Sequence, residues 1–152
     1  MVDTEGGGSG GPTVEIVPRV ETDLPPLFGL ASGVFAGLPG WSEERVIDVL
    51  RNDVVFIARE RGQVAGFVAL RLEEGGAIVI EQLLVATGHE RRGIGHSLLA
   101  YAEGYAINER ARSLQIVVEQ DNHSARSFYR RSGFLPVPSE LELFELVLPS
   151  GF

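Results

Sequence analysis

The 152-residue chain has no cysteine, one methionine and one tryptophan, and aromatic residues make up 8% of it. The lack of cysteine excludes disulfide frameworks, thiolate zinc sites and thiol nucleophiles. Basic residues are also few, because 13 Lys and Arg residues stand against 21 Asp and Glu residues and give a net charge of −8. Proteins that bind nucleic acids usually present a basic face, so we expect no nucleic-acid partner.

Long apolar runs are missing as well. A membrane span needs roughly 20 consecutive apolar residues, and no stretch of the sequence approaches this length. The N-terminus has no apolar signal core, and residues 1–12 are instead rich in glycine. We therefore expect a cytoplasmic protein that does not bind membranes, with a flexible tail over residues 1–12 and a single domain over residues 13–152.

Hydrophobic periodicity and turn residues predict the order of the secondary-structure elements. The predicted strands cover residues 13–20, 53–60, 64–73, 77–85, 113–119, 134–136 and 141–148, and the predicted helices cover residues 24–35, 43–52, 94–109 and 122–132. Short turns join the second, third and fourth strands into an antiparallel meander, whereas the long helix before the fifth strand makes the fourth and fifth strands parallel. The sequence predicts an α+β fold with a mixed, mostly antiparallel sheet of six or seven strands, one central parallel pair and about four helices.

Residues 81–97, EQLLVATGHERRGIGHS, are typical of a strand, a polar loop ending in Gly93-Ile94-Gly95, and the start of a helix. The first turn of a helix offers unpaired N–H groups and partial positive charge, so this stretch predicts a phosphate site. A P-loop is excluded because no G-K-[ST] follows, and Leu98 stands where a dinucleotide fingerprint needs its third glycine. Taken alone, the two glycines are equally consistent with a structural turn.

A second motif follows the strand over residues 113–119. It places Asn122, Ala125 and Tyr129 near one side of a helix that Gly133-Phe134 follow. Together the two segments resemble the GNAT superfamily of acyl-CoA-dependent N-acyltransferases. Residues 90–95 resemble the family's Q/R-x-x-G-x-G/A loop, and residues 122–134 match its N-x-x-A-x-x-F/L-Y-x-x-x-G-F segment. One departure is Glu90, which stands where the family has Gln or Arg.

The resemblance implies that acetyl-CoA is the cosubstrate and that its pantetheine arm lies between two splayed parallel strands. It also implies that the backbone N–H of Val85 polarises the thioester carbonyl. The implied cofactor-binding residues are Leu83, Leu84 and Val85 at the pantetheine arm, Arg91, Arg92, Gly93, Ile94, Gly95, His96 and Ser97 at the pyrophosphate, and Asn122, Ala125, Phe128 and Tyr129 on the second helix.

The chemistry that the resemblance implies is direct attack of an amine on the thioester. Tyr129 occupies the position of the family's usual acid, and its alternative role is that of a core aromatic residue. Glu81 is the candidate base, with Glu119 as its rival, and either carboxylate could also be a solvated charge at a strand end. The three histidines share no metal-ligand spacing, so we expect no metal.

The sequence therefore predicts an acetyl-CoA-dependent N-acetyltransferase that acts on a primary amine of a small molecule or peptide in a ternary complex. The alternative is a non-catalytic acyl-CoA-binding or sensor module. Trp41 and the segment 35–41 line the acceptor side, or Trp41 has a surface or core role instead. The apolar last strand either pairs across a homodimer or completes its own sheet.

Overall fold

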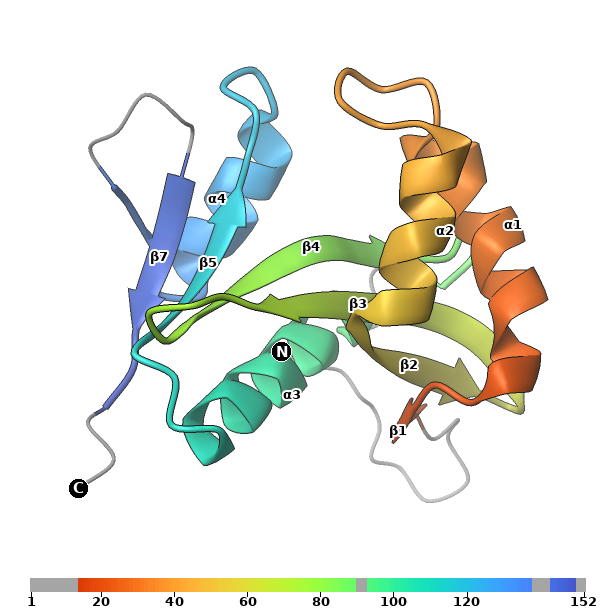
Figure 1. Cartoon of the computed structure of the whole chain (residues 1–152), viewed down its shortest axis with the longest axis horizontal. Coiled ribbons are helices and arrows are strands. Elements are labelled where there is room, and N and C mark those ends of the chain that lie inside the picture. The colour runs from red at the N-terminus through yellow and green to blue at the C-terminus, as the bar shows by residue number, and fades with distance from the viewer. Residues whose placement is uncertain (1–13, 90–92, 138–142, 150–152) are drawn as a thin grey trace. The chain divides into compact units, whose positions relative to one another are not determined.

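The computed structural model of the protein describes residues 14–89, 93–137 and 143–149 (Figure 1). The predicted N-terminal tail and residues Glu90, Arg91 and Arg92 lie outside the described residues. The strands are β1 (Val14–Pro18), β2 (Val54–Glu60), β3 (Gln63–Leu72), β4 (Ala77–Val85), β5 (Ser113–Val117), β6 (Leu135–Pro136) and β7 (Leu143–Val147). The helices are α1 (Leu24–Phe35), α2 (Glu43–Asn52), α3 (Ile94–Asn108) and α4 (His123–Arg131), and a 3₁₀ turn covers Glu21–Asp23.

The predicted fold class is confirmed. Seven strands form one sheet in the order β1-β2-β3-β4-β5-β7-β6. The β4–β5 pair is parallel and joins Ala77–Ile80 with Ser113–Ile116, whereas β1–β2, β2–β3, β5–β7 and β6–β7 are antiparallel. The last strand completes its own sheet, because β7 pairs with β5 on one side and β6 on the other.

One strand ends earlier than predicted. The sequence pattern extends the fifth strand to Glu119, but β5 ends at Val117. The Glu119 carbonyl accepts a hydrogen bond from the Asn122 N–H at 3.0 Å, so the backbone has already entered the turn before α4. The start of the predicted last strand, residues 141–142, lies outside the described residues.

The chain divides into two compact units, and both β4 and α3 contribute to each of them. The first unit contains the residues up to Leu70 together with Glu81–Tyr101. The second contains Arg71–Ile80 and the residues from Ala102 onward.

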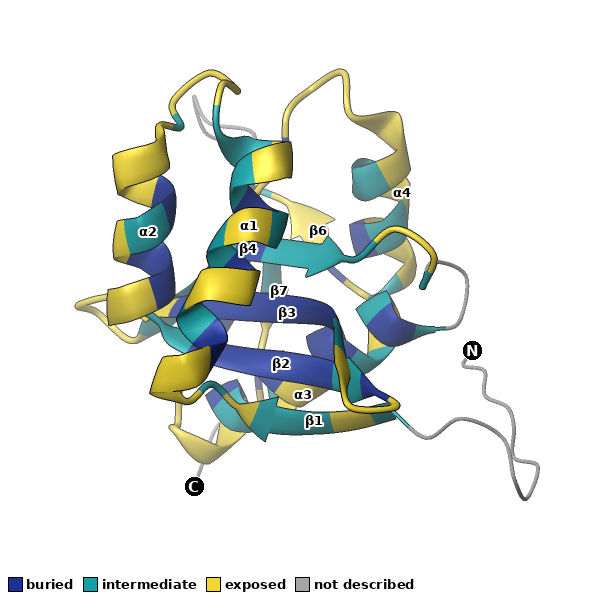
Figure 2. Cartoon of the chain, turned by 90° about the vertical axis from the view of Figure 1, so that its right-hand side faces the viewer, coloured by how far each residue is buried: buried dark blue, intermediate teal, exposed yellow. Residues whose placement is uncertain are grey.

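In the first unit, α1 and α2 cover β2 and β3, which Figure 2 shows as buried strands behind the two helices. The buried core here consists of Leu27, Ala31, Val46, Val49, Leu50, Val55, Ile57, Phe67 and Ala69. Ser42 caps the N-terminus of α2, because its Oγ accepts a hydrogen bond from the Arg45 N–H at 3.1 Å. The first half of α3 also packs on β2, with the Tyr101 ring 4.8 Å from the Phe56 ring.

The core of the second unit forms around β5, β7 and α4. Leu114 of β5, Phe144 of β7 and Phe134 after α4 are fully buried or nearly so. The guanidinium groups of Arg126 and Arg130 on α4 lie over the Phe144 ring, at 5.1 and 5.7 Å from its centre. These contacts hold α4 against the β7 side of this unit.

A buried charge holds the start of α1. Asp23 is 5% exposed, and its carboxylate accepts hydrogen bonds from the Val20 N–H at 2.8 Å and from the Arg59 guanidinium. Burial alone would raise the pKa of Asp23, but the Val20 hydrogen bond and the Arg59 charge together lower it below its usual value. The pair therefore connects the segment before α1 to β2.

We expect Asp23→Asn to lower the free energy of unfolding at pH 7 by about 1–3 kcal/mol, because it leaves the part-buried Arg59 without its charged partner. The folded-state pKa of Asp23 is depressed, so its stabilisation is present above about pH 4 and is lost as the pH falls through the folded-state value. The difference between the two proteins in urea unfolding should therefore shrink below pH 4. The control is Asp48→Asn at an exposed position of α2, which should lower the free energy of unfolding by less than about 0.5 kcal/mol. Equal effects of the two substitutions would contradict the role of Asp23.

Candidate functional site

The glycine-containing stretch folds as its sequence predicts wherever it is described. β4 ends at Val85, and a turn follows in which the His89 N–H donates to the Ala86 carbonyl at 3.0 Å. Gly93 has a φ of +75°, a conformation that favours glycine, and α3 begins at Ile94. The first-turn N–H groups of α3 therefore face the loop, where a helix can hold an anion.

The predicted pantetheine-binding residues Leu83, Leu84 and Val85 are all half-buried. Leu84 packs against the core beneath α1 and α2. The Ala86 N–H donates to the Ala65 carbonyl at 2.8 Å, so the end of β4 is fixed to β3.

Gly66 allows this close approach of β3 and β4. A Cβ atom at position 66 would lie 2.5 Å from the Leu84 carbonyl oxygen, 3.3 Å from the Val85 Cα and 3.2 Å from the Leu98 side chain. Leu98 lies one turn into α3, so a single missing side chain gives room to both the strand and the helix of the candidate site. A glycine inside a strand is the signal that could have indicated this contact from the sequence.

A part-buried contact between Glu60 and His89 connects the end of β2 to the turn after β4. Glu60, the last residue of β2, has a side chain that is only 5% exposed, and its Oε1 lies 2.6 Å from His89 Nδ1. His89 is the last described residue before Glu90. The predictions from sequence missed this pair, because the two residues lie 29 positions apart and neither belongs to a motif.

Glu81, the candidate base, lies at the middle of β4, and its side chain is 11% exposed. Its Oε2 lies 3.8 Å from Nη2 of Arg45 on α2. The Arg45 guanidinium is 4.0 Å from the centre of the Trp41 ring, and its Nη1 donates to the Gly40 carbonyl at 2.5 Å. The segment before α2 thus meets the strand that carries Glu81.

The predictions from sequence also did not identify Gln82, the next residue of β4, as a notable residue. It is 1% exposed, and neither its amide nitrogen nor its amide oxygen has a hydrogen-bond partner within the part of the chain that the structure describes. A polar side chain in this position is costly to bury, so Gln82 is unusual among the core residues of the first unit.

The second motif lies in the second unit. The Asn122 side chain accepts the Ala125 N–H at 3.1 Å and caps α4, as predicted. Phe128 is half-buried, and Tyr129 is 4% exposed, with its ring 5.0 Å from Phe128 and 5.4 Å from Phe134. Burial raises the pKa of the Tyr129 phenol well above its usual value, so the group stays protonated at every pH at which an enzyme normally works.

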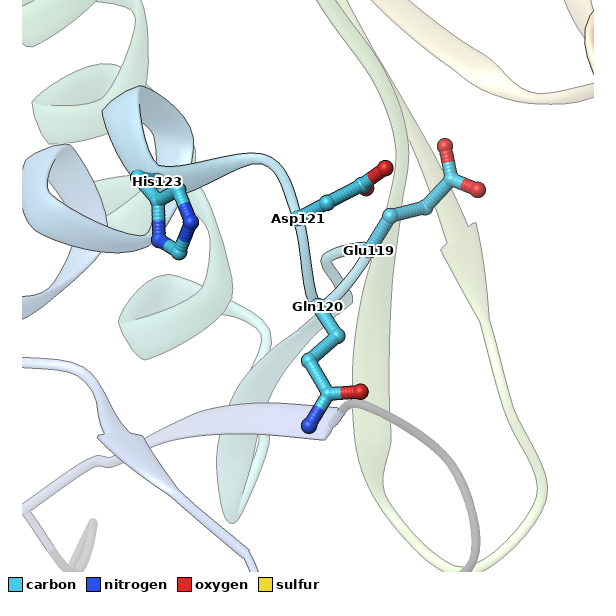
Figure 3. A pocket seen from close by; sticks show the side chains of 4 residues that line it. All are labelled: Glu119, Gln120, Asp121 and His123. Atoms are coloured by element: carbon cyan, nitrogen blue, oxygen red, sulfur yellow. The ribbon is translucent and has the colours of Figure 1, made fainter.

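Glu119, the rival base, belongs to the second unit and is exposed. With Gln120, Asp121 and His123 it lines an open depression of about 530 Å³ (Figure 3). In this view Glu119 and Asp121 extend to the same side, whereas Gln120 and His123 extend away from them. Glu119 is thus more accessible to water than Glu81.

The first unit therefore contains Glu81, Leu83–Val85 and Gly93–Ser97, and the second contains Glu119 and the residues from Asn122 to Tyr129. Among the described residues, no three His, Asp or Glu side chains are grouped so that they could hold a metal ion. No helix in the described ranges is long and apolar enough to cross a membrane.

A family model described as the acetyltransferase (GNAT) family matches residues 27–134, more than half of the chain. The chain is 30% identical over 88 residues to the uncharacterized N-acetyltransferase YhfO of Bacillus subtilis (strain 168), a match that covers 55% of this chain and 59% of that protein. It is 36% identical over 74 residues to streptothricin acetyltransferase of Streptomyces lavendulae, which covers 48% of this chain and 39% of that protein. The chain thus spans only about half the length of these curated relatives.

Solved structures show the same fold. The PaiA N-acetyltransferase from Thermoplasma acidophilum, solved in complex with coenzyme A, matches with a TM-score of 0.73 and 20% identity. The match covers 89% of this chain and 99% of that chain.

We expect Gly66→Ala to lower the free energy of unfolding by about 1–3 kcal/mol, because the new methyl group forces the β4 backbone away from β3. Hydrogen exchange at the Ala86 N–H should accelerate in parallel, since that group donates across the same strand pair. The control is Gly29→Ala in α1, where no atom lies within 4 Å of the new Cβ and the helix should gain about 0.5–1 kcal/mol. Unchanged exchange at Ala86 in Gly66→Ala would show that β4 does not depend on this contact.

Proposed function

Since the chain belongs to the acetyltransferase (GNAT) family, we propose that it is an acetyl-CoA-dependent N-acetyltransferase. The acceptor is a primary amine of a small molecule or peptide, and the transfer takes place by direct attack in a ternary complex. The observation that carries this proposal is the start of α3 at a positive-φ glycine immediately after the strand and loop of the first motif.

The residues of the first unit fit an acyl-CoA ligand. The first-turn N–H groups from Ile94 to His96 suit the pyrophosphate, because they are oriented donors at the positive end of a helix dipole. The Ser97 N–H already donates to the Gly93 carbonyl at 2.9 Å, so Ser97 would lie close to the pyrophosphate without using this group. Arg91 and Arg92, outside the described residues, would add positive charge. The half-buried backbone of Leu83, Leu84 and Val85 would supply N–H and C=O groups to the two amides of the pantetheine arm.

When bound, acetyl-CoA supplies a thioester whose acetyl group is transferred to the amine, giving an amide and a free thiol. The Val85 N–H would donate to the thioester carbonyl and stabilise negative charge that develops on its oxygen. The family resemblance assigns Asn122, Ala125 and Phe128 on α4 to binding of the same ligand.

Two side chains handle protons in this proposal. The amine must attack in its neutral form, so the Glu81 carboxylate would accept its proton and pass it to solvent. Glu81 suits this role better than Glu119, because its side chain is largely shielded from water and lies on the strand that precedes the loop. Tyr129 would donate to the departing sulfur.

We expect purified protein to release free thiol from acetyl-CoA only when a suitable primary amine is present, and calorimetry should show saturable binding of acetyl-CoA but not of NAD. The binding preference follows from a pyrophosphate site that lacks the dinucleotide fingerprint, and the amine-dependent release of thiol follows from direct transfer in a ternary complex. A broad panel of amines, amino acids and peptides provides the acceptors. Acetyl-CoA binding without transfer to any amine would favour the acyl-CoA sensor module. No binding at millimolar acetyl-CoA would contradict both the N-acetyltransferase and the sensor module.

We expect Tyr129→Phe to lower kcat by about a hundredfold, with less than a threefold change in the Kd for acetyl-CoA, because it removes the donor but keeps the ring. Since burial raises the pKa of Tyr129 above its usual value of about 10, the acid form persists, and the wild-type rate should show no descending limb from this group below pH 10. Tyr101→Phe, which removes an exposed hydroxyl on α3, is the control. An unchanged kcat in Tyr129→Phe would remove Tyr129 from the acid role.

A further inference from the structure

Arg45 on α2 holds its guanidinium group beside the candidate base. The guanidinium carbon lies 4.0 Å from the centre of the Trp41 ring, Nη1 donates to the Gly40 carbonyl at 2.5 Å, and Nη2 lies 3.8 Å from Oε2 of Glu81. All four residues belong to the first unit.

The position of this guanidinium is fixed from two sides. The Trp41 face attracts the cation, and the Gly40 carbonyl takes one of its five N–H donors. Trp41 is itself anchored, because its ring packs against the core of the first unit and lies 5.4 Å from the Phe35 ring. A charged group that is already immobilised loses little further side-chain entropy when a ligand binds.

The same guanidinium still has donors to offer. Its side chain is 46% exposed, and the separation of 3.8 Å from Glu81 is longer than a hydrogen bond. Within the described residues, the Gly40 carbonyl is the hydrogen-bond acceptor that the Arg45 guanidinium contacts. The planar fork of an arginine is suited to binding a carboxylate through two parallel N–H groups.

Arg45 and Glu81 thus present charges of opposite sign side by side. A purely cationic acceptor would meet Glu81 but would be repelled by Arg45 a few ångströms away. An acceptor whose amine is adjacent to an acidic group would match both, with its ammonium on Glu81 and its anion on Arg45. The whole chain carries a net charge of −8, and a local cation of this kind offsets the repulsion that an anionic group would otherwise meet.

We propose that the acceptor of this enzyme is a free α-amino acid, whose carboxylate binds Arg45 while its α-amine is presented to Glu81. This inference rests on the proposed function and narrows its acceptor class. It makes polyamines and peptide N-termini poor acceptors, because neither carries an acidic group next to the reactive amine. Arg45 is then the residue that determines specificity.

The test uses sets of three acceptors that share one side chain: the amino acid, its amide and the amine that lacks the carboxyl group. Phenylalanine, phenylalaninamide and phenethylamine form one set, and lysine, lysinamide and cadaverine form another. The measurement is kcat/KM from thiol release with the 152-residue chain. We expect the amino acid to exceed its amide by about tenfold to a hundredfold, the usual effect of one charge-assisted hydrogen-bond pair.

Variants connect this preference to Arg45. Arg45→Ala should reduce the ratio of amino acid to amide to about one through an increase in KM for the amino acid. Arg45→Glu should reverse the ratio, and Arg45→Lys should retain part of it. Arg51→Ala, an exposed arginine at the other end of the same helix, should keep the wild-type ratio.

The two proposals fail in different ways. Transfer to amides, cadaverine or peptides that equals or exceeds transfer to amino acids would overturn the inference while leaving the N-acetyltransferase intact. A wild-type ratio in Arg45→Ala would also overturn it. No transfer to any amine would refute the proposed function and the inference together.

Discussion

At Gly66 the backbone of β4 passes so close to β3 that a Cβ atom would lie 2.5 Å from the Leu84 carbonyl oxygen. The Ala65–Ala86 hydrogen bond fixes the strands at the same place. Leu98 on α3 approaches the same glycine, so the strand that precedes the loop and the helix that follows it are both placed by one missing side chain. Whatever the loop binds, the geometry of its two ends depends on this contact, because close-packed backbone and side chains cannot move independently.

In the second unit, the burial that positions Tyr129 also changes its chemistry. Its ring is enclosed edge-on between Phe128 and Phe134, and the same enclosure raises the pKa of the phenol. A weaker acid transfers its proton less readily to a thiolate whose ordinary pKa is about 8.5. In the proposed mechanism the phenol would therefore act mainly as a hydrogen-bond donor to the departing sulfur and would keep its proton.

The sequence was sufficient to predict the order of all seven strands and four helices, because glycines and prolines bound them and their apolar periods are clear. It also located both motifs and the Asn122 cap. It could not show how Glu60 meets His89 or how Glu81 meets Arg45, since these pairs join residues 29 and 36 positions apart and leave no local pattern. The pKa of Tyr129 escaped prediction for the same reason, because burial depends on tertiary packing.

Three shielded carboxylates of the first unit each meet a basic partner, but the pairs differ in how tightly they are made. Asp23 is hydrogen-bonded to Arg59, and Glu60 lies 2.6 Å from His89, so breaking either pair leaves a buried charge. Glu81 and Arg45 are 3.8 Å apart, and the Arg45 side chain is 46% exposed. Of the three carboxylates, Glu81 would lose the least on exchanging its basic partner for a ligand, because its contact with Arg45 is the longest. The Glu81–Arg45 pair is therefore the one best suited to bind a zwitterion.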